Sequence, residues 1–328
     1  MSDLPHLIPL FFMLYVALGL AEPKTIAVSV AFAIFIAWGI ERGKNVEWKD
    51  YGLDVEDKYI VWAFWLSLAI VGLQIGMLHK VPLLNPAVRT NLNPRLTALT
   101  YFLGVPSSVY LFMKGRRYSL LYPVVVALYA YRTPVVVSAL ALGIAYYRER
   151  NLPGKKSLLA LSGIAGGGLL LFLLVTFLRG NGLSSLWTRI QSTVSVLDVI
   201  VWRGGWSGYY KGALQWAGMK SYLGHGYAPR GLVAKFLYVH TGATITPTLL
   251  GGMYLDFGVF ALIEGFLLGL YYGMLTKAEH PITKALYYST LAYGIVGVET
   301  GLLDLPVYAL FLLAVYILYR GWRVVREG

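Results

Sequence analysis

The sequence predicts an all-α membrane protein, a polytopic helix bundle with about ten transmembrane helices and one large, partly helical loop. Apolar residues make up 57% of the 328-residue chain and charged residues only 13%, whereas a soluble domain carries about 25% charged residues. Runs of about 18 or more apolar residues, long enough to cross the hydrocarbon core as helices, recur along the whole chain. These runs do not alternate between apolar and polar residues, which argues against a membrane barrel of strands.

Ten apolar runs divide a single predicted membrane domain, residues 1–328. The first run lacks the basic residues of a secretory signal in front of it, so it is interpreted as a retained helix. The fifth and sixth runs are short and meet at Tyr131–Thr133, so they form either two spans or one broken or re-entrant element. The eighth run is long enough to tilt or to project above the membrane. The predicted spans are 4–20, 25–40, 59–78, 96–113, 119–131, 133–147, 157–178, 247–275, 284–301 and 303–319.

Basic residues in the short connections predict the orientation, because cytoplasmic loops are enriched in Lys and Arg. With ten spans, four basic groups fall on one side together with both termini. We therefore expect a multi-pass protein of the cell (plasma) membrane with cytoplasmic termini, and we expect the loop 179–246, between spans seven and eight, on the outer face. The four groups are Lys114, Arg116 and Arg117; Arg148, Arg150, Lys155 and Lys156; Lys277 and Lys284; and Arg320, Arg323 and Arg326.

The predicted outer loop carries more positive charge than the topology requires. It holds seven Lys or Arg residues and one acid, Asp198, for a net charge of +6. Because the arginine fork pairs phosphate oxygens in a bidentate manner, this charge favours a phosphate or pyrophosphate ligand. Snorkelling to lipid headgroups is the alternative explanation for Arg179, Arg189 and Lys235.

Four arginines are the expected phosphate contacts. Arg132 lies at a tight turn within an apolar hairpin, where a charge is costly unless it has a partner, so we expect it to be functional. Arg89 lies in the predicted outer segment 79–95, and Arg203 and Arg230 lie in the outer loop.

Aromatic residues and glycines also gather in the outer loop. The segment 183–200 has apolar residues near helical spacing and predicts an amphipathic helix that lies on the membrane. Most of the aromatic side chains are expected in the interfacial belt, although the same residues could stack on sugar rings. A basic, aromatic cleft above the lipid surface would fit a sugar attached to a lipid diphosphate. The aromatic residues are Trp187, Trp202, Trp206, Tyr209, Tyr210, Trp216, Tyr222, Tyr227 and Tyr238.

The sequence contains no motif of the common soluble enzymes, such as a Walker loop, HExxH or G-x-S-x-G. Cysteine is absent, which excludes disulfides, thiolate catalysis and Cys-ligated metal. The short connection 21–24 has no paired acids, which disfavours a metal-dependent membrane glycosyltransferase, so we expect no metal and no cofactor. Among the few carboxylates within spans, Glu264 is the one that favours an ion-coupled transporter. These carboxylates are Asp256, Glu264, Glu299 and Asp304.

His240 is the best candidate in the outer loop for proton transfer, because imidazole changes its charge near neutral pH. It precedes a small polar run, residues 241–248, that leads into the eighth span. Hydroxyls and backbone N–H groups at the start of a helix favour anions, so this run also fits a phosphate ligand.

Two short motifs resemble those of a known family. The stretch TPTLLGGMYLDFG at Thr246–Gly258 and the YRT at Tyr131–Thr133 resemble patterns of oligosaccharide repeat-unit polymerases, the Wzy-type O-antigen polymerases. His240 and Gly251 have the His/Arg-x10-Gly spacing of this group and of the related O-antigen ligases. Family members often have an acid where this chain has Gly252.

The resemblance implies an inverting, metal-independent glycosyltransferase of the C-type membrane architecture. Such an enzyme joins oligosaccharide units carried on a polyprenyl or dolichyl diphosphate at the outer face, and arginines hold the diphosphate as it leaves. His240 is the expected acid/base residue. Tyr254 and Asp256 are expected to line the pocket from the eighth helix, with Asp256 as the second candidate base. The implied partners are a lipid-linked oligosaccharide donor and acceptor, membrane lipid and other glycan-assembly membrane proteins, with no nucleic acid.

A transporter or flippase for an anionic lipid-linked glycan is the alternative. It would use the same basic cleft but needs a route to the inner face. The scarcity of charge within the spans, apart from Glu264 and Glu299, counts against it.

Overall fold

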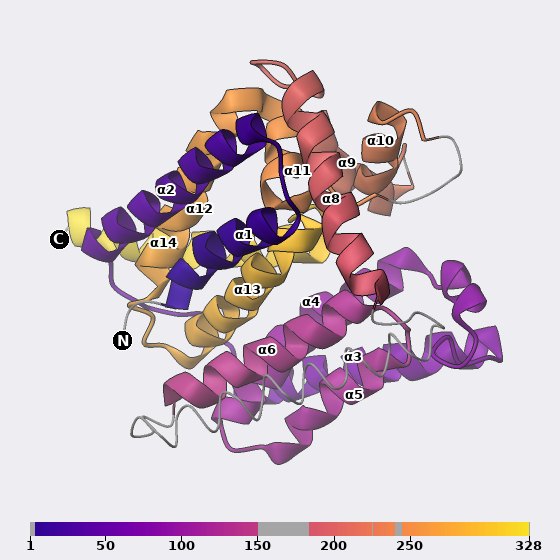
Figure 1. Ribbon diagram of the computed structural model, residues 1–328. Helices are drawn as coiled ribbons and strands as arrows, with labels where there is room; N and C mark the ends of the chain where they lie inside the picture. Colours follow the sequence, from indigo (N-terminus) through magenta and orange to yellow (C-terminus); the bar gives the residue numbers. More distant parts are fainter. Residues whose placement is uncertain (1–3, 150–183, 225, 240–244, 328) are drawn as a thin grey trace.

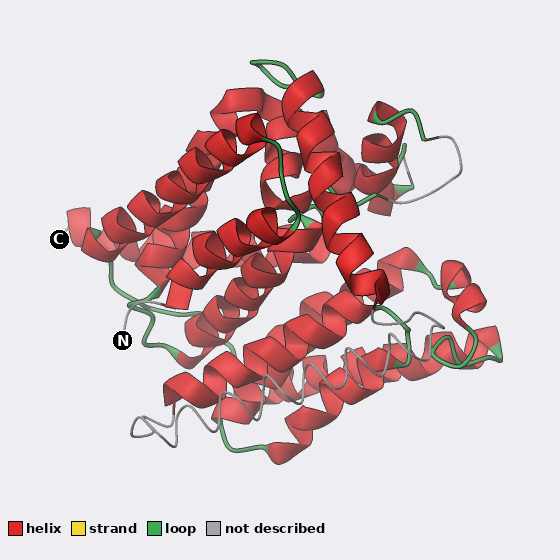
Figure 2. Ribbon diagram, in the orientation of Figure 1, coloured by secondary structure: helices red, strands yellow, loops and turns green. Residues whose placement is uncertain are grey.

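The computed structural model describes residues 4–149, 184–224, 226–239 and 245–327, and every regular element in these ranges is a helix (Figures 1 and 2). The prediction of an all-α polytopic membrane bundle is therefore confirmed. The first half comprises η1 Leu4–His6, α1 Leu7–Leu18, α2 Pro23–Asn45, α3 Asp57–Leu78, η2 Pro86–Asn91, α4 Pro94–Met113, η3 Arg117–Leu120, α5 Leu121–Ala127 and α6 Arg132–Glu149. The second half comprises α8 Ser184–Arg203, α9 Ala213–Lys220, η4 Ser221–Leu223, α10 Pro229–Phe236, α11 Thr248–Phe257, η5 Gly258–Phe260, α12 Ala261–Leu275, α13 Pro281–Thr300 and α14 Leu305–Glu327.

Five of the described helical segments are long and apolar enough to cross a membrane, and α1 with η1 forms a shorter apolar helix. The five are Pro23–Asn45, Asp57–Leu78, Pro94–Met113, Thr248–Leu275 and Leu305–Arg326. The predicted span 157–178 lies outside the described residues. The predicted fifth span, 119–131, contains only the end of η3 and the seven-residue α5, which is far shorter than the hydrocarbon core is thick. That part of the chain fits the broken or re-entrant interpretation, and the number of ten spans stays a prediction.

α13 is the central helix of the bundle. It packs against α1, α11, α12 and α14 on one side and against α4 and α6 on the other. In Figure 1 these neighbours form two groups, with α8 crossing in front of the place where they meet. The carboxyl end of α13 therefore lies close to several elements that are distant in sequence.

The predicted eighth span is interrupted after Phe257. Gly258 adopts a φ of +59°, and a Cβ atom there would lie 2.2 Å from the carbonyl oxygen of Trp206. The Val259 N–H donates to that oxygen, and the N–H groups of Tyr209 and Tyr210 donate to the carbonyl oxygen of Leu255. Backbone groups freed by the break are thus satisfied by the loop after α8, which fixes this loop against the helix.

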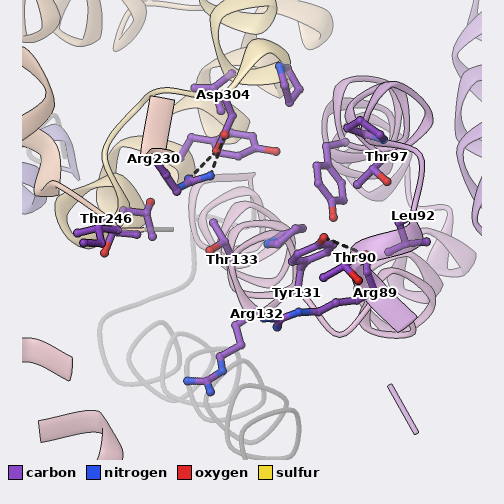
Figure 3. Close-up of a pocket in the computed structure, with 18 of the residues that line it drawn as sticks. Arg89, Thr90, Leu92, Thr97, Tyr131, Arg132, Thr133, Arg230, Thr246 and Asp304 are labelled. Atoms are coloured by element: carbon purple, nitrogen blue, oxygen red, sulfur yellow. Dashed lines mark hydrogen bonds and ion pairs between the residues drawn. The ribbon is translucent and has the colours of Figure 1, made fainter. Parts of the chain in front are cut away.

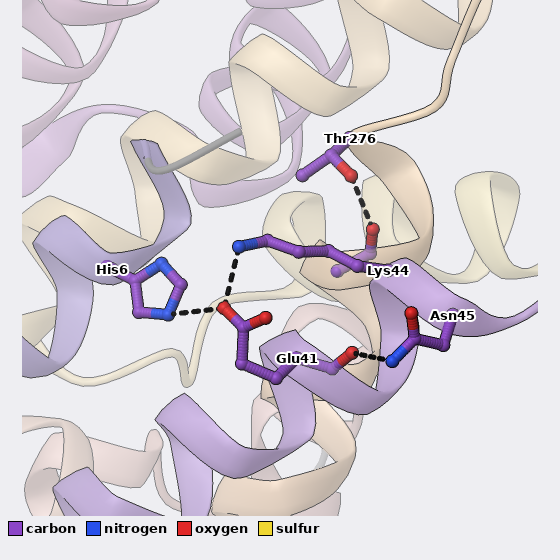
Figure 4. A network of polar contacts seen from close by, with 6 residues as sticks. His6, Glu41, Lys44, Asn45 and Thr276 are labelled. Carbon is purple, nitrogen blue, oxygen red and sulfur yellow. Dashed lines mark hydrogen bonds and ion pairs between the residues drawn. The ribbon is translucent and has the colours of Figure 1, made fainter. Parts of the chain in front are cut away.

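At the carboxyl end of α2, a polar cluster holds the amino terminus of the described chain (Figure 4). The Glu41 carboxylate accepts from Lys44 at 2.6 Å and from His6 Nε2 at 3.1 Å. Nearby, the Asp50 carboxylate accepts the backbone N–H groups of Glu279 and His280, just before α13. A carboxylate that accepts the amides before the first turn of a helix favours the start of that helix. The segment 46–56 therefore fixes the amino end of α13.

The tightest helix contact joins α2 and α12. Glycines four residues apart face one another: Gly39 and Gly43 on α2, and Gly265, Gly269 and Gly273 on α12. A Cβ atom on Gly269 would lie 2.1 Å from the carbonyl oxygen of Ile36, and one on Gly39 equally close to that of Phe266. Because no side chain separates the backbones, dispersion contacts and close approach replace the hydrophobic effect as the source of helix association in lipid.

Replacing Gly269 with leucine is expected to lower the stability of the protein by about 3 kcal/mol or more, because the backbone of α2 cannot move away without losing the neighbouring contacts. The measurement is thermal unfolding of the purified protein in detergent. Gly72→Leu is the matched control, since a Cβ atom at Gly72 on α3 meets nothing within 4 Å. Equal unfolding temperatures for the two variants would contradict the close α2–α12 contact.

Candidate functional site

A cavity of about 750 Å³ opens where the two helix groups meet (Figure 3). Its wall is built from η2, the amino ends of α4 and α6, α8, α10 and the segment between α13 and α14. Neutral hydroxyl groups form much of this wall. They belong to Tyr101, Tyr131, Tyr222, Tyr293, Thr90, Thr97, Thr133, Ser192, Thr193, Thr246 and Thr300.

Four arginines line the cavity, whereas Asp304 is the only carboxylate among the described residues that line it. Three of them, Arg89, Arg132 and Arg230, are predicted phosphate contacts, and the structure brings them together from η2, α6 and α10. The fourth is Arg189 on α8, a residue that sequence reasoning assigned equally well to lipid headgroups. The cavity is therefore strongly basic.

The turn before α6 positions Arg132 and Arg89. Ala130 has a φ of +60°, which turns the chain sharply, and Arg132 then begins α6. The Tyr131 hydroxyl donates to the carbonyl oxygen of Arg89 at 3.4 Å, and the Arg89 guanidinium lies over the Tyr131 ring. Figure 3 shows Tyr131 beside Arg89 and between Thr90 and Arg132. The YRT motif thus holds two arginines at one side of the cavity.

Arg230 and Asp304 form a bidentate pair at the other side. Arg230 Nη1 donates to Oδ1 at 3.0 Å and Nη2 donates to Oδ2 at 2.8 Å. The Asp304 carboxylate raises the pKa of Arg230, although burial of the guanidinium opposes this effect. This parallel geometry is the strongest form of an arginine–carboxylate contact, and it ties α10 to the segment before α14. Beside it, burial raises the pKa of Tyr222, so this phenol stays neutral and can donate.

α8 is held against the bundle at both ends. Near its start, Arg189 Nε donates to a Glu299 oxygen at 2.5 Å. Near its end, Asp198 accepts the backbone N–H of Glu22 at 3.1 Å, and the Trp202 indole N–H donates to the Glu22 carboxylate. The predicted helix 183–200 is confirmed as an amphipathic helix over Ser184–Arg203, and it packs against α1, α2 and α11.

The remaining predicted site residues do not line this cavity. Arg203 is exposed at the end of α8, and Tyr254 is buried within the bundle. Asp256 is fully buried, and its carboxylate accepts the N–H groups of Leu214 at 2.9 Å and Gln215 at 2.8 Å. It therefore caps the start of α9, where these two amides have no partner within the helix. His240 lies outside the described residues.

Glu264 is also engaged by the loop. The Gln215 side-chain amide donates to both of its oxygens, at 2.9 and 3.0 Å. The Glu264 carboxylate, which by sequence favours an ion-coupled transporter, is thus hydrogen-bonded to a side chain of α9.

Sequence reasoning missed the contribution of Asp304 and of two cavity tyrosines, Tyr101 and Tyr293. A local signal exists for Asp304, because the Asp304-Leu305-Pro306 order places an acid just before a helix whose second residue has no N–H. For Tyr101 on α4 and Tyr293 on α13, no local signal separates a cavity residue from an ordinary interhelical one.

Together, the fold and the cavity define a polytopic helical membrane protein with an arginine-rich site between its helices. The family model described as "Putative O-antigen polymerase" matches residues 1–311, and the chain belongs to this family. This confirms the resemblance inferred from the two motifs. The chain is also 28% identical over 327 residues to an uncharacterized protein of Methanocaldococcus jannaschii, covering 93% of this chain and 90% of that protein. No solved structure matches the chain.

Replacing Asp256 with alanine is expected to lower stability by about 1–3 kcal/mol, because two amides of α9 lose their buried acceptor. The stability of Asp256→Asn should lie between those of the wild type and of Asp256→Ala, since an amide offers one acceptor oxygen in place of two. Thermal unfolding in detergent measures both effects. Asp54→Ala, at an exposed position, is the control. An unfolding temperature for Asp256→Ala equal to that of the control would show that Asp256 does not act as a cap.

Proposed function

We propose that this protein is a membrane glycosyltransferase that polymerises or transfers oligosaccharide units from a polyprenyl- or dolichyl-diphosphate-linked donor at the outer membrane face. The observation that carries the proposal is the cavity with four arginines and a single described carboxylate. Family membership supports glycan assembly in the membrane. The donor, the acceptor, the inverting and metal-independent reaction and the outer location are parts of the proposal.

The arginines supply what a diphosphate leaving group needs. Arg89, Arg132 and Arg189 come from three different elements, so they can surround the two phosphates from several directions. Negative charge on the diphosphate grows as the bond to the sugar breaks. Guanidinium groups that are already in place stabilise that charge without reorganisation. A divalent cation has this function in metal-dependent enzymes.

The neutral hydroxyl groups suit the sugar. Threonine, serine and tyrosine hydroxyls donate and accept hydrogen bonds, as sugar hydroxyls do. The volume of about 750 Å³ lies within the usual range of ligand pockets. A diphosphate with a small number of sugar residues fits this range, whereas the polyprenyl chain would remain in the surrounding lipid.

Partners follow from this chemistry. The donor and the acceptor are both lipid-linked oligosaccharides, and membrane lipid surrounds the protein. Other glycan-assembly membrane proteins would supply the donor on the same side of the membrane. The direction of the cavity toward the outer face and the cytoplasmic position of the termini follow from the distribution of basic residues in the short connections.

Replacing Arg89 or Arg132 with alanine is expected to weaken binding of geranylgeranyl diphosphate at least tenfold, because each charge-assisted contact contributes about 1.5–3 kcal/mol. Titration of the purified protein in detergent measures the dissociation constant. Lys80→Ala is the control for general surface charge, since Lys80 is exposed and does not line the cavity. Equal losses in the arginine variants and the control would refute a phosphate site in the cavity.

The transfer reaction itself is tested with polyprenyl-diphosphate-linked oligosaccharide extracted from the organism that encodes the chain. Protein in liposomes should convert this lipid into products longer by whole repeat units. The Arg132→Ala variant should lose this activity while it elutes as a folded protein. Movement of the lipid across the bilayer without any new glycosidic bond would instead identify a flippase and refute the transferase.

A further inference from the structure

Asp304 has an unusual position for an acid beside a helix. It immediately precedes α14, and its carbonyl oxygen accepts the N–H groups of Val307 and Tyr308. An aspartate at such a position normally uses its carboxylate to accept an amide of the first helical turn. Pro306 removes one of these amides, and among the described residues no backbone N–H donates to the Asp304 carboxylate. The side chain turns toward Arg230 and the cavity instead.

The contact with Arg230 leaves the carboxylate able to accept more hydrogen bonds. Each oxygen receives one N–H from Arg230, whereas an ionised carboxylate has about four acceptor sites. The Asp304 side chain remains 30% exposed, so it is accessible from the cavity. Arg230 thus fixes the orientation of this group.

Asp304 also lies across the cavity from the proposed diphosphate site. Figure 3 shows the Arg230–Asp304 pair at one side of the view and Arg89 with Arg132 at the other. A sugar bound between them would have its leaving group near Arg89 and Arg132 and its opposite face toward Asp304. An inverting transfer needs this arrangement, because the acceptor hydroxyl attacks from the side opposite to the leaving group.

We propose that Asp304 is the catalytic base that orients the acceptor hydroxyl and takes its proton, a role that rests on the proposed transferase function. The acceptor oxygen forms a bond to the anomeric carbon of the donor sugar. The bond from that carbon to the diphosphate oxygen breaks, and its electron pair leaves with the lipid diphosphate. The hydroxyl proton moves to an oxygen of Asp304, and it is later released to solvent. Arg230 is a positioning residue for this base.

The test compares Asp304→Asn with Glu299→Gln. Both changes remove an acid that pairs with an arginine near the end of α13, but Glu299 does not line the cavity. Loss of a general base lowers kcat by about 10²–10⁴-fold. We therefore expect the kcat of Asp304→Asn to fall at least a hundredfold. Its dissociation constant for geranylgeranyl diphosphate should stay within about threefold of the wild-type value. The kcat of Glu299→Gln should fall less than about tenfold.

The pH dependence separates a base from a structural anchor. The Asp304→Asn rate should rise with pH, as hydroxide replaces the missing base, whereas the wild-type rate should stay level from neutral pH upward. Asp304→Glu retains the charge and can still pair with Arg230, so it keeps the fold if Asp304→Asn does not. Because its carboxylate is displaced by one methylene, it should lose kcat about tenfold or more and bind the diphosphate normally.

Three results would overturn the role. One is an Asp304→Asn variant that keeps more than about one-tenth of the wild-type kcat. Another is an Asp304→Glu variant with the full wild-type kcat. The third is an equal loss of kcat in Asp304→Asn and Glu299→Gln, which would indicate that both acids only anchor the loop. A wild-type protein that binds the diphosphate but forms no glycosidic bond would refute the proposed function itself, whereas the first three results leave it intact.

Discussion

Two arginine–carboxylate pairs tie the loop that contains α8, α9 and α10 to the helix bundle beside the cavity. Glu299 near the end of α13 binds Arg189 of α8, and Asp304 just beyond α13 binds Arg230 of α10. The side chains of these pairs are 27–40% exposed, so solvent partly screens the pairs, and they act mainly by fixing the geometry of the loop. Both acids lie at the same end of the central helix. The position of α13 therefore determines where the loop closes over the bundle.

The position of α13 in turn depends on close helix packing and on one carboxylate before its first turn. Glycines allow α2 and α12 to approach with their backbones in contact, and α12 packs beside α13. At the opposite end, the Asp50 carboxylate binds the amides before α13. Close packing in the membrane thus sets the helix in place, and the ion pairs use its end as an anchor.

The sequence predicts the parts of this arrangement that depend on local patterns. Apolar runs identify the helices that are long enough to cross a membrane. The helical spacing of apolar residues over 183–200 identifies α8. The interruption at Gly258 is not predictable in the same way. It depends on the Trp206 carbonyl oxygen, which comes from a loop distant in sequence and accepts the Val259 N–H. The sequence also left open whether residues 119–131 form a span or part of a re-entrant element, since an apolar run of that length has the same composition in both.

The candidate site shows the same division. Positive charge on the predicted outer face drew attention to Arg89, Arg132 and Arg230, which line one cavity, and to Arg203, which does not. Their role as phosphate contacts stays a prediction. From the sequence, Asp256 and not Asp304 is the second candidate base, although both are among the few carboxylates within the predicted spans. The Asp256 carboxylate is fully buried where it accepts two amides of α9, whereas the Asp304 side chain is 30% exposed and lines the cavity. Exposure to the cavity therefore distinguishes the two acids, and this exposure depends on how distant elements pack in the folded chain.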